Sequence, residues 1–452
     1  MNALNHANTA TRKKSRFTLL LSAIAAGTMT AGALLPHAAM AQEEAPEPTN
    51  SQSFAQLYGP IANTVTGETK DWAGAATRIP ELKAAMKNRK DRHTTGNFML
   101  IVGGQVNDDR MRREGIELML RSTLVPAEDV ARFHYYSGSL AFNYDEPGSA
   151  RASWKRAVDA GYADNDGDVF NDPQYLIAQS LIQEERERDA FEFLLPYLEA
   201  NATPGAGQND KMIRLGLQAA IDIDDTQMGN RFARMLIEDG NSAETWKVGL
   251  QVVAMMNPMD EKPELELYRL MRDAGAMTQR PEYIRYIESA DPRLMSNELD
   301  DVLAEGLRDG FFKTSGDQYY LEVKQVIDTR KAIDMRELDQ TVAEGRNGDA
   351  AAARIAGDIL YSVDDFGQAA GFYELAAERG YQADAAHTRV GIAHTMAGNY
   401  SEAMSAFASV SGDYAVVAEF WALYAQSKMP AAPAPAPAAE PMMDDTAAMP
   451  TT

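Results

Sequence analysis

The chain of 452 residues contains no cysteine. Disulfides, thiolate nucleophiles and cysteine-based zinc sites are therefore excluded, and so is a lipid anchor attached to a cysteine side chain. Long hydrophobic runs are also missing after the first 41 residues, so the rest of the sequence offers no membrane-spanning segment. A stable fold in this part of the chain has to form by noncovalent packing.

Basic residues are too few to balance the acidic ones. The chain has 43 Lys and Arg against 66 Asp and Glu, which gives a formal net charge of −23. This charge disfavours nucleic acids and anionic membrane surfaces as partners. It is compatible with a basic protein surface, with divalent cations, or simply with solubility, and the composition does not choose between these three.

Recognisable catalytic motifs are also missing. No histidine lies in a His-Glu-x-x-His pattern, and no serine lies in a Gly-x-Ser-x-Gly elbow. The pair Gly103 and Gly104 is followed by neither a phosphate-loop lysine nor a dinucleotide-binding spacing. A triad or a carboxylate pair assembled from distant residues remains open. The sequence predicts no cofactor.

The first 41 residues have the pattern of a secretory signal peptide. A basic start is followed by an apolar run over residues 17–35 and by a small-x-small cleavage site at residues 39–41. We therefore expect a mature chain that begins at Gln42 and is periplasmic, with loose association with the envelope as an open alternative. Acidic, proline-containing residues 42–53 and Pro/Ala-rich residues 429–452 are predicted to be disordered.

The C-terminal part of the chain repeats with a 34-residue period. Segments that begin at residues 350 and 384 carry the same residue types at the same offsets. Such a period, with small residues and aromatics at fixed places, is typical of helical-hairpin repeats. The small residues are expected where two helices cross, and the large ones between hairpins. The matched pairs are Gly357 and Gly391, Phe366 and Tyr400, Ala369 and Ala403, Tyr373 and Phe407, and Ala376 and Val410.

These segments resemble the tetratricopeptide repeat family, whose degenerate consensus places Trp, Leu-Gly, Tyr, Ala, Phe and Ala across 34 positions. The resemblance covers two clear repeats and a capping helix over residues 350–428, with Trp421 at the tryptophan position. It implies an all-α, right-handed superhelical solenoid of two-helix hairpins. Degenerate repeats continue the match over residues 97–349, where the unit that begins at Ala131 places four residues in register: Gly138, Ala150, Trp154 and Ala157.

Parts of the chain depart from this pattern. Several units end in a large residue, then a small one and then a glycine, as in Trp154, Ala157 and Gly161, which is similar to Sel1-like repeats. Residues 54–96 show helical patterning without the motif and are predicted to form an N-terminal cap. No Gly or Pro occurs over residues 317–344, which predicts one long helix that interrupts the stack.

The resemblance also implies where a partner would bind. Ligands of the family lie in the concave groove formed by the first helix of each repeat, and the candidate groove residues here are Arg132, Tyr135, Phe142, Arg354 and Tyr361. The Lys and Asn of the family's peptide clamp are absent from the corresponding places, so binding of a chaperone-type acidic C-terminus is not supported. We expect a non-catalytic scaffold or adaptor for a protein or peptide in the bacterial cell envelope. A cell-envelope enzyme on a helical superhelix and a self-assembling structural repeat protein are the alternatives.

One acidic loop is a candidate calcium site. Asp164, Asp166 and Asp168 surround Gly167, and calcium prefers such hard oxygen ligands. The loop does not match an EF-hand, because aligning Gly167 with the invariant glycine places Pro173 where a bidentate glutamate is needed. A solvated turn rich in Asp, Asn and Gly explains the same residues.

Overall fold

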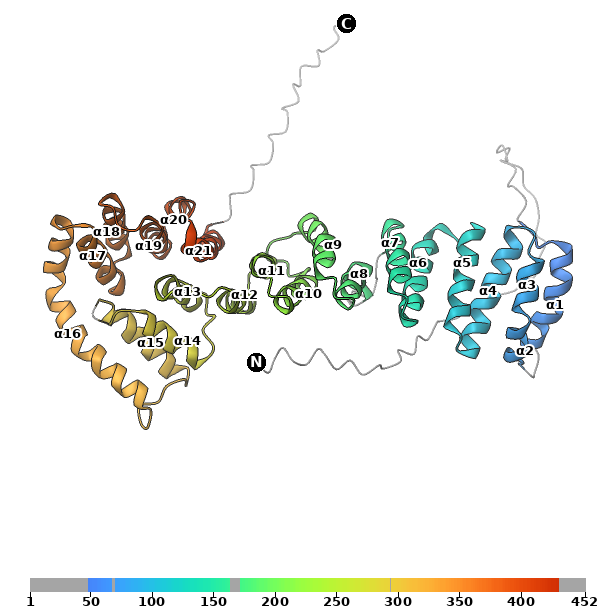
Figure 1. Ribbon diagram of the computed structural model, residues 1–452, viewed down its shortest axis with the longest axis horizontal. Helices are drawn as coiled ribbons and strands as arrows, with labels where there is room; N and C mark the ends of the chain where they lie inside the picture. The colour runs from blue at the N-terminus through green and yellow to red at the C-terminus, as the bar shows by residue number, and fades with distance from the viewer. Residues whose placement is uncertain (1–47, 67–69, 163–170, 293, 431–452) are drawn as a thin grey trace, which may run out of the picture. The chain divides into compact units, whose positions relative to one another are not determined.

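The computed structural model describes residues 48–66, 70–162, 171–292 and 294–430 (Figure 1). The predicted signal peptide, the candidate calcium ligands Asp164, Asp166 and Asp168, and the tail from residue 431 lie outside the described residues. These three predictions are therefore not tested by the structure.

Every regular element in the described ranges is helical, which confirms the predicted all-α class. Consecutive helices pack against one another along the chain, as a stack of helical hairpins requires. The helices are α1 Gln52–Thr66, α2 Trp72–Thr77, α3 Ile79–Ala85, α4 Arg89–Val106, α5 Asp109–Ser122, α6 Ala127–Asn143, α7 Pro147–Asp159, α8 Pro173–Ile182, α9 Glu187–Ala200, α10 Asp210–Asp222, α11 Thr226–Gly240, α12 Ala243–Met256, α13 Glu261–Asp273, α14 Arg280–Ser289, α15 Ser296–Arg308, α16 Gln318–Asn347, α17 Ala350–Ser362, α18 Phe366–Glu378, α19 Ala383–Met396, α20 Tyr400–Phe407, the short 3-10 helix η2 Gly412–Tyr414, and α21 Ala415–Lys428.

Several hairpins share one packing device, in which an aromatic ring lies on a glycine of the preceding helix. A Cβ added at Gly391 would lie 2.4 Å from the ring of Phe407, and one at Gly138 would lie 2.5 Å from the indole of Trp154. The backbones can approach this closely because the glycines carry no side chain. The same contact joins two further pairs, Gly216 with Phe232 and Gly357 with Tyr373.

The other residues expected at repeat positions also lie inside the stack. The small ones, Ala150, Ala157, Ala369, Ala376 and Ala403, are fully buried, whereas the aromatics Phe366 and Tyr400 are partly buried. Four hairpins end in a glycine with positive φ, and the N–H of the next residue donates to a carbonyl five residues back, as in a Schellman cap. These glycines are Gly161, Gly275, Gly310 and Gly380.

We expect Gly391→Ala to lower the free energy of unfolding by about 1–3 kcal/mol, because the new methyl group would overlap the ring of Phe407. Gly371 on α18 is a matched control, since nothing lies within 4 Å of where its Cβ would be. Gly371→Ala should raise the same free energy by about 0.5–1 kcal/mol through helix propensity. Urea unfolding followed by circular dichroism measures both values. Equal effects of the two substitutions would contradict the ring-on-glycine packing.

The N-terminal helices α1 to α4 form their own small core around Phe54, Ile61 and Leu82. The fully buried carboxylate of Asp91 accepts hydrogen bonds from the backbone N–H of Ser51 at 2.8 Å, from its hydroxyl at 2.7 Å and from the N–H of Lys87 at 2.9 Å. These bonds tie the start of α1 to the start of α4, and they hold the pKa of Asp91 below its usual range although burial alone would raise it.

The boundary predicted between residues 96 and 97 falls inside α4, where the helix is continuous. Gly96 does not interrupt the helix because it serves helix packing, and a Cβ there would lie 2.5 Å from the carbonyl oxygen of Gly115 on α5. Gly103 has the same role, with Asp108 and Arg112 against it. The N-terminal core and the repeats therefore share α4.

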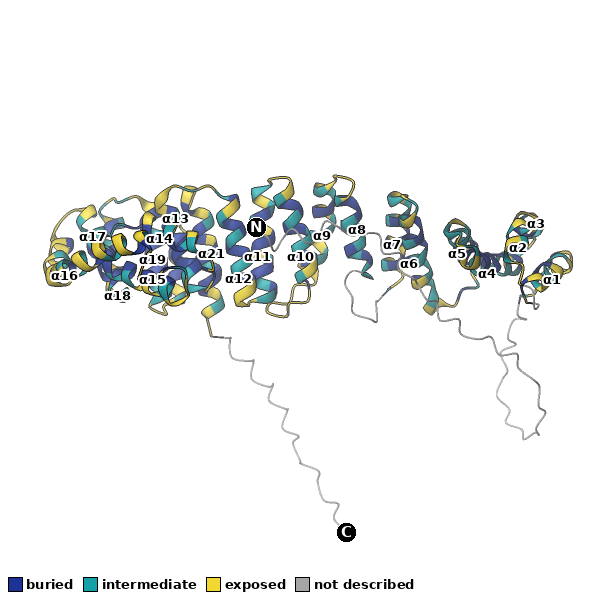
Figure 2. Cartoon of the chain, turned by 90° about the horizontal axis from the view of Figure 1, so that it is seen from below, coloured by how far each residue is buried: buried dark blue, intermediate teal, exposed yellow. Residues whose placement is uncertain are grey.

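The segment without Gly or Pro forms one long helix, α16, which confirms that prediction. Its buried residues Tyr320, Ile327 and Asp334 recur at seven-residue intervals, so one narrow stripe packs against α15 and α17. Figure 2 shows the rest of α16 largely exposed, in contrast to the buried surfaces that run along the neighbouring helices.

The C-terminal repeats do not contact sequence neighbours alone. Helix α21 packs against α13, and α15 packs against α17 (Figure 1). The indole N–H of Trp421 donates to the carbonyl of Glu266 at 2.7 Å, and the hydroxyl of Tyr424 donates to the carbonyl of Asp273 at 2.9 Å. The segment from α17 to α21 thus returns to α13, and Trp421 closes this contact rather than only capping the last repeat. We call the contact region between α13–α15 and α17–α21 the junction.

Candidate binding cavity

The junction is held by a network of buried charges. Arg269 on α13 donates from Nε and Nη2 to the two carboxylate oxygens of Glu298 on α15, both at 2.7 Å, and from Nη1 to Glu266 at 2.8 Å. Arg389 on α19 donates from Nε to Glu266 at 3.0 Å and from Nη1 to Asp358 on α17 at 2.9 Å. All five side chains are buried. The network therefore links four helices through bidentate and shared charge-assisted hydrogen bonds.

Tyrosines complete this network. The hydroxyl of Tyr286 donates to Glu298 at 2.5 Å, and that of Tyr373 donates to Asp358 at 2.9 Å. The guanidinium of Arg269 lies 4.3 Å from the centre of the Tyr361 ring, which is a cation–π contact. Burial raises the pKa of all three tyrosine hydroxyls well above the usual range, so they stay protonated, and those of Tyr286 and Tyr373 donate hydrogen bonds.

The buried ions remain charged. Burial would raise the pKa of Glu298, but Arg269 holds it below its usual value. Burial likewise would lower the pKa of Arg269, yet the carboxylates of Glu266 and Glu298 raise it well above the ordinary range. Loss of one partner would therefore leave the others as uncompensated charges in the interior.

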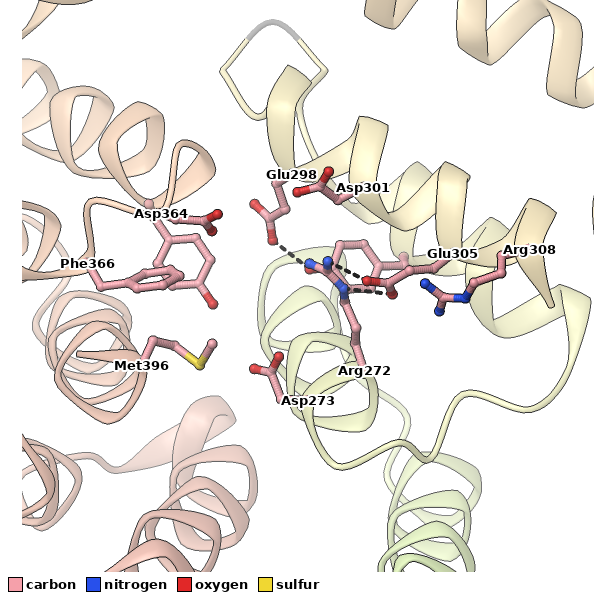
Figure 3. Close-up of a pocket in the computed structure, with 11 residues that line it drawn as sticks. Arg272, Asp273, Glu298, Asp301, Glu305, Arg308, Asp364, Phe366 and Met396 are labelled. Carbon is pink, nitrogen blue, oxygen red and sulfur yellow. Dashed lines mark hydrogen bonds and ion pairs between the residues drawn. The ribbon is translucent and has the colours of Figure 1, made fainter. Parts of the chain in front are cut away.

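A cavity of about 380 Å³ opens beside this network, between α13–α15 and the α17–α19 repeats (Figure 3). Its walls include the rings of Tyr286, Tyr361 and Phe366 and the thioether of Met396. Charged residues complete the lining: Arg272, Asp273, Glu298, Asp301, Glu305, Arg308 and Asp364. The cavity lining is therefore mainly polar, with an excess of carboxylates and a smaller share of aromatic and thioether surface.

Asp273 is the carboxylate with the most unusual environment in this cavity. It lies at the end of α13, and its side chain makes no hydrogen bond or ion pair with the described residues. Its neighbour Arg272 is turned to Glu305, with hydrogen bonds of 3.0 and 2.7 Å. The cavity reaches Asp273, but the surrounding protein desolvates it strongly, and Arg272 only partly offsets this effect. The pKa of Asp273 is raised to about 7 as a result.

The mouth of the cavity carries two exposed aspartates, Asp301 on α15 and Asp364 in the turn between α17 and α18. Partial burial raises the pKa of Asp301, and the charge of Asp364 adds to this. Neither carboxylate has a hydrogen-bonding or ionic partner within the parts of the chain that the structure describes. The two arginines that line the cavity are engaged elsewhere, Arg272 with Glu305 and Arg308 with Asp309.

The groove residues predicted on α6 lie away from this cavity. Arg132 is exposed and pairs with Asp129 on its own helix. Tyr135 is only 5% exposed and stacks on Tyr162, with ring centres 4.5 Å apart. Phe142 is partly buried and packs on Trp154. Tyr135 therefore presents little surface to a partner, because its ring is stacked on Tyr162.

The two groove residues predicted on α17 lie at the junction. Arg354 pairs with buried Asp358 and lies 5.8 Å from the centre of the Tyr381 ring. Tyr361 is 6% exposed and is covered by Arg269, so it presents little open surface outside the cavity. It nevertheless lines the cavity with Phe366. Folding of α13 against α17 buries a face that an isolated solenoid would leave open.

Sequence reasoning missed the cavity residues on α13 and α15. Charged residues three or four positions apart on a helix usually form solvated pairs, which conceals Glu266, Arg269 and Asp273. These charges of α13 share one face of the helix, as on an ordinary surface helix, opposite its apolar residues: Leu265, Leu267, Tyr268, Leu270 and Met271. The local sequence therefore does not reveal that Glu266 and Arg269 are buried, since this depends on the helices that pack against their face.

The described residues contain neither a cluster of metal-ligand side chains nor a membrane-spanning helix. No group of three or more His, Cys, Asp or Glu side chains there is arranged to hold a metal ion. None of the helices in the described ranges is both long and apolar enough to cross a membrane.

Comparisons with known proteins add little to this description. No protein-family model matches the chain, and no curated protein matches it. Among solved structures, the chain is similar to one described as the structure of Naa15/Naa10 bound to HypK-THB, at 13% sequence identity and a TM-score of 0.26, over 83% of this chain and 65% of that one. The chain thus spans less than two thirds of that relative's length, and a TM-score of this size does not establish a common fold.

Proposed function

We propose that this chain is an exported, non-catalytic helical-repeat scaffold that binds a protein or peptide partner in the bacterial cell envelope. The observation that carries the proposal is the junction cavity, because it is open to solvent, has aromatic walls and holds carboxylates without partners. A stack of helical hairpins provides the extended, rigid frame that such binding proteins use. The pattern of residues 1–41 supports export.

Binding is favoured over structural self-assembly by the chemistry of the cavity. In a symmetric dimer formed through this surface, the acidic cavity mouths of the two copies would lie close together and repel each other, unless a basic patch lay between them. A partner with a basic or amphipathic segment meets the same carboxylates with opposite charge. The net charge of −23 also favours a basic partner over a second copy of the same acidic chain.

The test is affinity capture from cross-linked periplasmic extract, with the full-length chain tagged at its C-terminus and expressed in its own type of host. We expect the recovered bait to begin at Gln42, and a partner to be recovered with it. Asp301→Arg, which places the chain's own cation at the cavity mouth, should lose that partner. Asp339→Arg is the matched control, because Asp339 is an exposed residue of α16 that does not line the cavity.

Recovery of the same proteins with the wild type and with both variants would mean that the cavity is not the binding site. Recovery of no specific protein would count against a scaffold. A bait that still carries residues 1–41 would contradict export through a cleaved signal peptide.

A further inference from the structure

We propose that the junction cavity binds the cationic end of an arginine or lysine side chain of the partner, with Asp273 as its main counter-ion and Asp301 and Asp364 at the mouth. This inference rests on the proposed function and names the chemistry of the partner. Its basis is the charge balance of the cavity, the shape of its walls and the unpaired state of Asp273.

The charge balance of the lining favours a cation. Five carboxylates and two guanidinium groups line the cavity. Both guanidinium groups already have acidic neighbours, and Glu298 is neutralised by Arg269. Among the described residues, the side chains of Asp273, Asp301 and Asp364 form no ion pair, and nearby cations such as Arg272 only partly offset the charges of Asp273 and Asp301. A buried carboxylate without a partner is unfavourable, so a ligand that supplies one positive charge gains more here than a neutral or anionic ligand.

The walls fit the rest of such a side chain. Tyr361, Phe366 and Met396 contribute aromatic rings and a polarisable sulfur to the lining. Figure 3 shows Phe366 and Met396 on the side of the cavity opposite Arg272 and Glu305. An alkyl stem packs on such groups, and a guanidinium or ammonium group is attracted to aromatic faces. The junction already contains this combination, since Arg269 lies over the ring of Tyr361 while its guanidinium bonds to carboxylates. The cavity offers the same kinds of group, an aromatic ring and carboxylates, to a ligand.

The lining is contributed by two regions that are distant in the sequence. Asp273 and Asp301 come from α13 and α15, whereas Asp364, Phe366 and Met396 come from the C-terminal repeats. A bound cation would therefore contact both sides of the junction at once, which distinguishes this site from a groove on one face of a solenoid.

Binding should depend on pH through Asp273. Its carboxyl group ionises as the pH rises through about 7, whereas an arginine probe stays charged. We therefore expect the affinity for such a probe to rise roughly tenfold between pH 6 and pH 8, because protons compete with the cation at low pH. The charged and titratable groups that face Asp273 are Arg269, Arg272, Glu298, Glu305, Tyr286, Tyr361 and Tyr424.

The test is titration calorimetry of the mature chain at pH 8 with N-acetyl-arginine amide and N-acetyl-citrulline amide, which is nearly isosteric but neutral. We expect the arginine probe to bind at least tenfold more tightly, and Asp273→Asn to weaken its binding by roughly tenfold or more. Asp339→Asn should leave the affinity unchanged. Equal affinities for the two probes, or an unchanged affinity in Asp273→Asn, would overturn the inference.

Two further arms identify the source of the cation. A pentapeptide with a central arginine should bind more tightly than agmatine and spermidine, whereas tighter binding of the free amines would show that the site serves small polyamines instead. The inference and the proposed function can fail separately. Binding of the arginine probe without any captured partner would contradict the scaffold function alone, and a captured partner whose binding survives loss of its basic residues would contradict the cation site alone.

Discussion

Arg269→Met is expected to lower the free energy of unfolding by about 3–5 kcal/mol, since the substitution leaves Glu298 and one oxygen of Glu266 as buried carboxylates without their main partner. The side chain of Arg269 is 1% exposed and makes three ionic hydrogen bonds, so water cannot replace the lost contacts without opening the junction. Denaturation in urea, followed by circular dichroism and by tryptophan fluorescence, measures the loss. Trp421, which lies in the same junction, should report it directly.

Arg336→Met is the matched control for this experiment. Arg336 lies on α16 and its side chain is 71% exposed. Among the described residues its one ionic partner is Glu337, at 3.5 Å. An exposed ion pair contributes about 0–1 kcal/mol, so this variant should unfold at nearly the wild-type urea concentration. If Arg269→Met and Arg336→Met had equal effects, the buried network would not hold the junction together.

A double substitution separates the ion pair from the packing around it. Arg269→Met combined with Glu298→Leu removes both charges, and we expect it to be more stable than Arg269→Met alone, because a buried charge without its partner is worse than an apolar pair. A double variant that loses the sum of the two single effects would show that the charges do not interact.

Asp273→Asn is expected to raise the free energy of unfolding by about 2–4 kcal/mol at pH 8. The pKa of Asp273 is raised from 3.8 to about 7 in the folded chain, so the folded state holds a proton that the unfolded state releases near pH 4. The stability contributed by this bound proton is complete below pH 4 and is lost as the pH rises through about 7. Asparagine resembles the protonated acid, and the variant therefore avoids the loss.

The difference between this variant and the wild type should thus be near zero at pH 4, increase up to pH 7 and stay constant at higher pH. Urea denaturation at pH 4, 5, 6, 7 and 8 measures the difference directly, and effects of other carboxylates cancel because both proteins share them. Asp339→Asn, at an exposed position of α16, should differ from the wild type by less than about 0.5 kcal/mol at every pH. A pH-independent difference for Asp273→Asn would contradict the raised pKa.

This gain in stability and the expected loss of ligand affinity come from one cause. An ionised carboxylate in a desolvated cavity is unfavourable in the free protein and becomes favourable when a cation neutralises it. Residues of a binding site commonly lower the stability of the free protein in this way. Higher stability together with weaker cation binding in Asp273→Asn would therefore support the raised pKa and the binding role of Asp273 independently.

The residues that identify the repeat could be found in the sequence because they act within one hairpin. Gly357 and Tyr373, or Gly391 and Phe407, meet across a single turn, and the same spacing recurs wherever two helices cross closely. The long helix α16 was equally visible, since the absence of Gly and Pro is a local property of the chain.

The candidate site was not predictable in the same way. Tyr361 and Tyr135 were expected on an open groove, because a repeat register specifies which face of a helix points outward but not what later folds against it. The charges of α13 likewise have the spacing of ordinary surface pairs, and the partner of Glu266 outside this helix, Arg389, lies far along the chain. No local pattern connects positions that are separated by a hundred residues.

The sequence by itself determined the helical class, the hairpin packing and the uninterrupted helix that separates the last repeats from the others. The tertiary structure alone decided that these last repeats return to α13, that Arg269 and Arg389 are buried between them, and that Asp273 is left without a partner in a cavity. The physical reason is the distance along the chain over which each effect acts. Propensity, periodicity and close packing act over one or two turns of helix, whereas burial and charge pairing depend on which distant surfaces meet.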